Sequence, residues 1–119
     1  MKTRTWIDPV FGSQFVLMWG GTPAQFGKVV KRDYDPAYDC DVDFVGRCVD
    51  TDKTPIHTVI IMLPQWRRTT YGIATLVHEL LHATERALVY RSVEHDEHTS
   101  EVYAYFLDSL VTRCLDILP

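Results

Sequence analysis

The segment His78-Glu79-Leu80-Leu81-His82, an H-E-x-x-H motif, constrains this chain more than any other part of its sequence. On an α-helix, residues i and i+4 project from one face, so His78 and His82 can offer two imidazole nitrogens to one Zn²⁺ ion. Glu79 follows His78 about 100° further round the helix, where its carboxylate reaches past the metal toward a water molecule. The motif therefore predicts a helix that carries a zinc site.

The residues around the motif argue against a chance occurrence on a solvated helix. Residues 73–77 and the two leucines within the motif are apolar, whereas accidental charge runs lie on polar helices. Of the ten His and Glu residues in the chain, nine lie between His78 and Glu101, and only His57 lies outside this stretch. We therefore favour a metal site over an accidental or decayed motif.

Length and charge narrow the class of protein. The 119 residues are expected to form a single domain, residues 1–119, which is long enough to bury a core without disulfides. The net charge is −4, and no basic run exceeds the pairs Lys31-Arg32 and Arg67-Arg68, which argues against a nucleic-acid partner. No apolar run approaches the roughly 20 residues of a membrane span, so we expect no membrane partner.

Cysteine usage and the start of the chain bear on location. Cys40, Cys48 and Cys114 include no C-x-x-C pair and leave an odd thiol under any pairing, which favours a reducing compartment. Residues 1–6 begin with basic side chains, but no apolar segment of a signal peptide precedes Asp8-Pro9. We therefore expect a cytoplasmic protein.

A strand, a helix and a loop are expected in the first third of the chain. The apolar residues 15–19 end at Gly20-Gly21 and predict a buried strand. Thr22 and Pro23 are typical of an N-cap and a first helical position, and the apolar spacing that follows predicts a short amphipathic helix to about Tyr34. The acidic, turn-rich residues 33–39 predict a loop that lacks the ligand order of an EF-hand.

Two strands are expected next. Residues 42–49 alternate between apolar and polar or small side chains, with Gly46 as a candidate bulge, and predict a half-exposed strand. A turn at residues 50–55 follows, and the β-branched residues 58–63 then predict a continuous strand. His57 stands at the entrance of this second strand, where we expect a surface or strand-end residue instead of a metal ligand.

The motif lies within a long predicted helix. Thr69 or Thr70 can cap this helix, and its apolar arc continues to about Tyr90. Glu85 shares the second, more polar stripe with His82, where it either orients the imidazole of His82 or is simply solvated. For His82 and its neighbours to bind metal, this stripe must face a cleft.

A last helix is expected after a polar loop at residues 91–98. It begins near Asp96, and one of its faces is apolar. The other face carries groups that bind metals or donate hydrogen bonds. These are His98 and, about one, two and three helical turns after it, Glu101, Tyr105 and Asp108.

A catalytic zinc site usually has three protein ligands and one open position, so a third ligand is required. A His six residues after His82 would complete one known arrangement, but that position is Leu88. Glu101 fits better, because 19 residues after His82 allow for the rest of one helix, a loop and the first turn of the next. Four other residues are alternative third ligands: Glu94, His95, Glu97 and His98. His98 is the strongest of them, because it lies on the same helix face as Glu101.

Residues 73–84 and the E-x-x-A-Y segment at residues 101–105 resemble the small zincin-type metallopeptidases of bacteriophages, sometimes called minimal zincins. The resemblance extends to residues 60–64 and, more weakly, to the N-terminal strand and helix, so it covers most of the chain. It implies an α+β fold with a small three-stranded sheet, in the order strand, helix, strand, strand, helix, helix. It also implies a gluzincin-like zinc site with the ligands His78, His82 and Glu101.

The resemblance implies a zinc-dependent metallopeptidase that hydrolyses a protein or peptide substrate with a metal-activated water and Glu79 as general base. A donor for the oxyanion is expected on the last helix, from Tyr105 or His98. An extended peptide is expected to add to the edge of the strand at residues 58–63. The implied location is the cytoplasm of an infected host cell.

Two other functions stay open at this point. A non-catalytic module with the zincin fold would keep structural zinc or none, and would dock to a host or virion protein. A zinc hydrolase could instead act on a non-peptide amide. Glu79 favours catalysis, because a purely structural zinc site requires no acid at that position.

Overall fold

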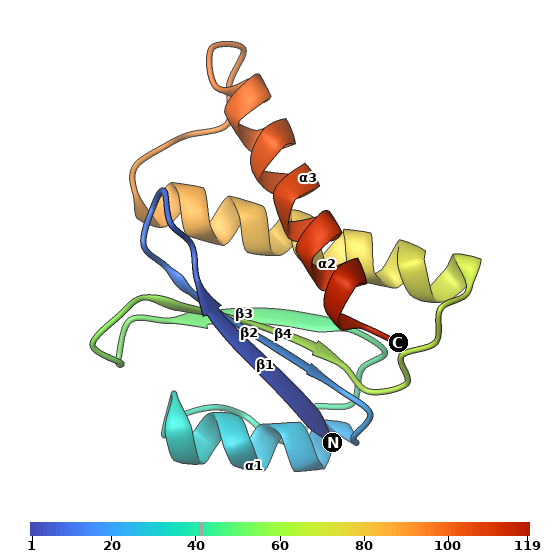
Figure 1. Ribbon diagram of the computed structural model, residues 1–119. Helices are drawn as coiled ribbons and strands as arrows, with labels where there is room; N and C mark the ends of the chain where they lie inside the picture. The colour runs from blue at the N-terminus through green and yellow to red at the C-terminus, as the bar shows by residue number, and fades with distance from the viewer. Residues whose placement is uncertain (41) are drawn as a thin grey trace.

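The computed structural model describes residues 1–40 and 42–119 (Figure 1). One sheet lies between two helical layers, with the strands in the order β1-β2-β4-β3. Helix α1 covers one face of the sheet, and α2 and α3 cover the other (Figure 1). The elements in chain order are β1 (Lys2–Ile7), β2 (Gln14–Trp19), α1 (Pro23–Asp33), β3 (Arg47–Thr51), β4 (Thr58–Leu63), α2 (Thr70–Tyr90) and α3 (Ser100–Ile117).

The α+β class is confirmed, but the expected three-stranded sheet is wrong because Lys2–Ile7 forms a fourth strand. Every residue of β1 except Trp6 is exposed, so this segment lacks the apolar alternation that marks a strand in a sequence. Backbone pairing forms β1 instead: it runs antiparallel to β2, from Lys2 opposite Trp19 to Ile7 opposite Gln14. The ring of Trp6 also stacks on Phe15, with 5.7 Å between the centroids.

Strand β4 lies in the interior of the sheet, with all six residues buried. It pairs in parallel with β2 and antiparallel with β3, so both of its edges are occupied. The expectation that a peptide adds to the edge of residues 58–63 is therefore wrong, and the edge strands are β1 and β3. Strand β3 begins at Arg47, five residues later than expected, and continues through Asp50 and Thr51, where a turn was expected.

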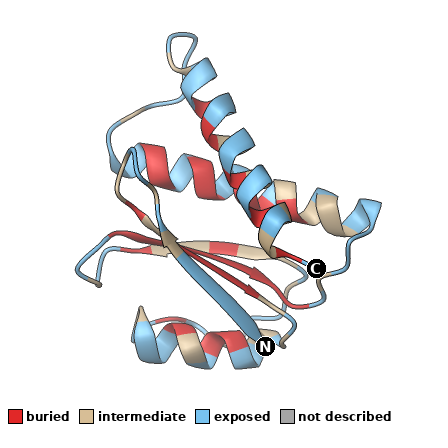
Figure 2. Cartoon of the chain, viewed as in Figure 1, coloured by how far each residue is buried: buried red, intermediate tan, exposed pale blue. Residues whose placement is uncertain are grey.

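The alternation of side chains along β2 and β4 divides the core in two. Phe15, Leu17 and Ile61 point to the layer of α2 and α3. Val16 and Ile60 point to α1 and pack with its apolar residues. Figure 2 shows the buried residues on the central strands and on the helix faces turned toward them.

Helix α1 begins as its sequence predicts. Thr22 is the N-cap, and its hydroxyl oxygen accepts a hydrogen bond from the Gln25 backbone N–H at 3.1 Å. The Gln25 side chain accepts one in return from the Thr22 backbone N–H at 2.9 Å. This reciprocal pair is a capping box, which satisfies two backbone donors that the helix leaves unpaired.

Helix α2 has the expected bounds, whereas α3 begins four residues later than expected. The Thr69 hydroxyl accepts a hydrogen bond from the Gly72 backbone N–H at 3.1 Å and caps α2. Before α3, the Asp96 carboxylate accepts hydrogen bonds from the backbone N–H groups of His98 and Thr99, at 2.8 and 3.1 Å. Such a side-chain turn competes with the helix for these donors and delays its start.

The C-terminal end of α3 is tied to the segment that leads into α2. The Trp66 indole N–H donates to the Pro119 carbonyl at 3.1 Å. Arg68 donates to the carbonyls of Leu115 and Leu118 at 2.6 and 3.1 Å. These bonds hold the C-terminal end of α3 against the segment before α2. None of the helices in the described part of the chain is long and apolar enough to cross a membrane.

Candidate metal centre

Helix α2 has one buried face and one face that is open to solvent. Leu76, Leu80 and Ala83 pack into the core between the sheet and α3. Glu79 lies at the border of this face and is only 7% exposed. His78 is exposed, and the side chain of His82 is 46% exposed. The two histidines therefore project from the part of α2 that neither the sheet nor α3 covers.

His78, Glu79 and His82 form the one group of three metal-competent side chains in residues 1–40 and 42–119 whose ligand atoms lie within 4.8 Å of one another. The two imidazole rings have centroids 4.9 Å apart and meet at 79°. Imidazole nitrogens and carboxylate oxygens are atoms that zinc and similar ions bind. The residues present therefore fit a metal ion, as the spacing of the motif predicts.

Glu79 packs against the chain just before β3. A Cβ atom on Gly46 would lie 2.7 Å from the Thr75 methyl, 3.1 Å from Glu79 Cγ and 3.2 Å from Glu79 Oε2. Gly46 is thus a site of close approach to α2 and precedes the strand, whereas the sequence indicated a bulge within one. Among the described residues, none donates a hydrogen bond to the Glu79 carboxylate, so its oxygens are available to a water molecule.

Glu85 lies beside His82, as the shared stripe predicts. Glu85 Oε2 is 3.9 Å from His82 Nδ1, and both side chains are about half exposed. This distance is within range of an ion pair but longer than a hydrogen bond. Glu85 therefore faces the nitrogen of His82 that a metal ion bound at Nε2 would leave free.

The other predicted site residues do not join this group. Glu101 lies in the first turn of α3 and is exposed, and Tyr105 is 70% exposed. The N-terminal end of α3 extends beyond α2 (Figure 1). Of the competing residues, His98 is exposed and lies 3.5 Å from Glu97, while His95 stacks on Tyr103 with 4.2 Å between the centroids.

A buried polar network that the sequence does not reveal lies close to the group. Of the two expected positions for His57, the strand end is confirmed, because His57 directly precedes β4, and the surface is wrong, because His57 is 4% exposed. Its Nδ1 is 2.9 Å from the hydroxyl of Ser13, and its Nε2 is 2.9 Å from Asp50 Oδ2. Its ring stacks on Tyr90, with 3.8 Å between the centroids. Arg86 of α2 donates to Asp50 Oδ1 at 2.7 Å and joins the network to the helix.

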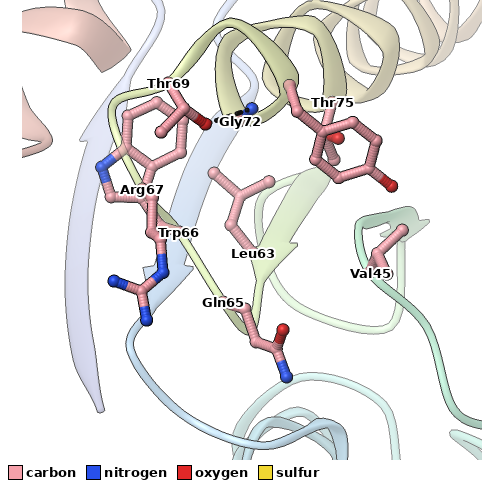
Figure 3. A pocket seen from close by; sticks show the side chains of 9 residues that line it. Val45, Leu63, Gln65, Trp66, Arg67, Thr69, Gly72 and Thr75 are labelled. Atoms are coloured by element: carbon pink, nitrogen blue, oxygen red, sulfur yellow. Dashed lines mark hydrogen bonds between the residues drawn. The ribbon is translucent and has the colours of Figure 1, made fainter.

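Two cavities flank the group along α2. The first, of about 170 Å³, lies at the start of the helix, and Leu63 is among the residues that line it (Figure 3). Thr75 lines this cavity and also contacts Gly46, which connects the cavity to Glu79. The second, of about 390 Å³, lies on the other side and is lined by Asp50, His82, Glu85, Arg86, Val89 and Tyr90.

Comparisons of this chain with protein-family models, with curated proteins and with solved structures find no match. The interpretation of the site therefore rests on its own residues. These residues give a candidate metal-binding group on α2, beside the edge strand β3 and between two cavities.

Proposed function

We propose that this protein is a zinc-dependent metallopeptidase of the zincin type, in which His78 and His82 hold the metal. The observation that carries the proposal is the His78-Glu79-His82 group, in which the largely buried Glu79 adjoins two open imidazoles. Zinc bound in such a site supplies Lewis acidity, which polarises a carbonyl and makes a nearby water more acidic.

Glu79 is the general base of the proposed reaction. Its carboxylate accepts a proton from the attacking water and then donates this proton to the leaving amine nitrogen. Burial against Gly46 fixes the direction of the carboxylate, so it requires little reorganisation during the reaction.

We assign the third ligand to Glu101 and a donor to the scissile carbonyl to Tyr105. Both lie on one face of α3, one helical turn apart, and both are exposed. Because Glu101 lies outside the His78-Glu79-His82 group, the first turn of α3 must move toward the histidines for Glu101 to bind the metal. Unchanged turnover in Tyr105→Phe would contradict the role of Tyr105.

The substrate is an extended peptide that adds to the free edge of β3. Main-chain hydrogen bonds along an edge strand give affinity, and side-chain pockets give selectivity. The cavity at the start of α2 has room for a bulky apolar side chain, since a cavity of about 150 Å³ lined by apolar residues holds a benzene ring. Val45, Leu63 and Trp66 provide its apolar lining (Figure 3).

One observation favours a second function. Glu101 lies outside the group of three side chains, so the described residues provide a motif without a third ligand in place. A non-catalytic module that docks to a host or virion protein would require nothing more.

Zinc stoichiometry by native mass spectrometry tests the proposal. We expect one zinc ion per chain in the wild type and in His98→Ala, and loss of zinc in His82→Ala and Glu101→Ala. Glu79→Gln should keep the metal but hydrolyse a fluorogenic peptide library about a hundredfold more slowly or worse, because it lacks the base. A wild type that binds no zinc after incubation with the metal would favour the docking module.

A further inference from the structure

Arg86 lies one helical turn beyond His82 on the same face of α2. The spacing of four residues repeats that between His78 and His82. A side chain on a helix covers the turn that precedes its own Cα, so Arg86 leans over the turn that carries His82. Both residues line the cavity of about 390 Å³ beside the metal-binding group.

Asp50 holds the guanidinium of Arg86 in place. Its Oδ1 accepts the hydrogen bond from Arg86 at 2.7 Å, while its Oδ2 is bound to His57. His57 is in turn held by Ser13, which is fully buried, and by the ring of Tyr90. The direction of the Arg86 side chain is therefore set by Asp50, which the buried His57 holds in turn, and little ordering is left for a bound substrate to impose.

Arg86 keeps hydrogen-bonding capacity toward the cavity. Its side chain is 44% exposed, and a guanidinium has five N–H donors in a planar fork. Of the six residues that line the cavity, Arg86 is the one permanent cation. The two acidic residues there face other partners: Asp50 faces Arg86 and His57, and Glu85 faces His82 Nδ1.

We propose that Arg86 donates a hydrogen bond to the scissile carbonyl oxygen of the substrate and stabilises the negative charge that develops on it. This role rests on the proposed metallopeptidase function. As the water oxygen bonds to the carbonyl carbon, the C=O π electrons move to the carbonyl oxygen. The C=O bond then re-forms as the C–N bond breaks and its electron pair leaves with the nitrogen. Glu79 donates to this nitrogen the proton that it accepted from the water. A fixed cationic donor stabilises the charged oxygen more than the neutral carbonyl, which lowers the barrier.

Calorimetric binding of two dipeptides to the zinc-loaded full chain tests the assignment. N-phosphoryl-leucyl-leucine amide carries a charged tetrahedral group, and leucyl-leucine amide is its counterpart without the phosphoryl group. Arg86→Met should weaken binding of the phosphoryl dipeptide about tenfold or more, because one charge-assisted hydrogen bond is lost. Its zinc content and its affinity for the amide should not change, and Arg86→Lys should restore part of the loss.

Arg32→Met is the matched control. Arg32 is also paired with an aspartate, Asp33 at 2.7 Å, but lies on α1, and its loss should affect neither ligand. Equal affinity of wild type and Arg86→Met for the phosphoryl dipeptide would overturn the role of Arg86 and leave the metallopeptidase proposal intact. The role of Arg86 is also overturned if the zinc-loaded wild type does not bind this ligand. A wild type without zinc would contradict both proposals.

Discussion

At the scale of single residues, Gly46 sets the environment of the proposed catalytic base. The missing side chain lets the backbone before β3 approach Thr75 and Glu79, and Glu79 is only 7% exposed. A single sequence does not reveal this role, because it depends on a contact between residues about 30 positions apart.

Gly46→Ala should therefore impair both stability and activity. Its Cβ would meet the Thr75 methyl at 2.7 Å, so either the chain before β3 or the Glu79 side chain must shift. We expect a loss of about 1–3 kcal/mol in the free energy of unfolding, measured with denaturant, and slower peptide hydrolysis. Thr75→Ser removes the clashing methyl, so the double variant should recover part of both losses. A single variant as stable as the wild type would contradict the close approach.

The cysteines give a second test at this scale. Burial raises the pKa of the Cys48 and Cys114 thiols to about 12, so the reactive thiolate is scarce near neutral pH. Cys40 is only partly buried. Iodoacetamide should therefore label Cys40 first in the native protein at about pH 8, as followed by peptide mass spectrometry. Denatured protein, in which all three thiols should react, is the control.

At the scale of elements, the network around His57 connects the turn before β2, the end of β3, the start of β4 and helix α2. His57→Ala would remove the ring that contacts Ser13, Asp50 and Tyr90, and would leave polar groups without a partner. We expect a loss of about 2–4 kcal/mol in the free energy of unfolding, seen as a lower Tm. His98→Ala is the matched control, because His98 is 84% exposed and should be nearly neutral. Similar Tm values for the two variants would show that the network contributes little.

Elements with local sequence signals were predicted, and those that depend on contacts between distant segments were not. Thr22, Pro23 and the apolar period of residues 73–88 are local signals, and they predicted α1 and α2 correctly. Strand β1 was missed because pairing with β2 forms it while its side chains stay exposed. The candidate metal group was predicted because all three of its residues lie within five positions on one helix. The partners of His57 come from three other segments, so no spacing in the sequence indicates them.

At the scale of the whole molecule, the proposed site is built from separate elements. The candidate metal group lies on α2, the proposed peptide edge is β3, and the proposed third ligand lies at the start of α3. The C-terminal end of α3 is tied to the start of α2 by Trp66 and Arg68. Its N-terminal end, which carries Glu101, extends beyond α2 (Figure 1). Helix α3 is therefore tied to the start of α2 at its C-terminal end. Near its other end, the buried Tyr103 donates a hydrogen bond to the Val93 carbonyl, whereas Glu101 is exposed.

This asymmetry predicts how the molecule responds to zinc. If Glu101 completes the site, zinc binding should hold the first turn of α3 against α2 and slow amide hydrogen exchange in residues 94–104, because local opening then costs the metal–ligand bond. His98→Ala should respond like the wild type, and Glu101→Ala should lose the protection. Zinc binding that protects only residues 76–84 would mean that the two histidines of α2 bind the metal without α3, as expected for the docking module. The exchange pattern thus distinguishes a three-ligand site built from two helices from a two-histidine site built on one.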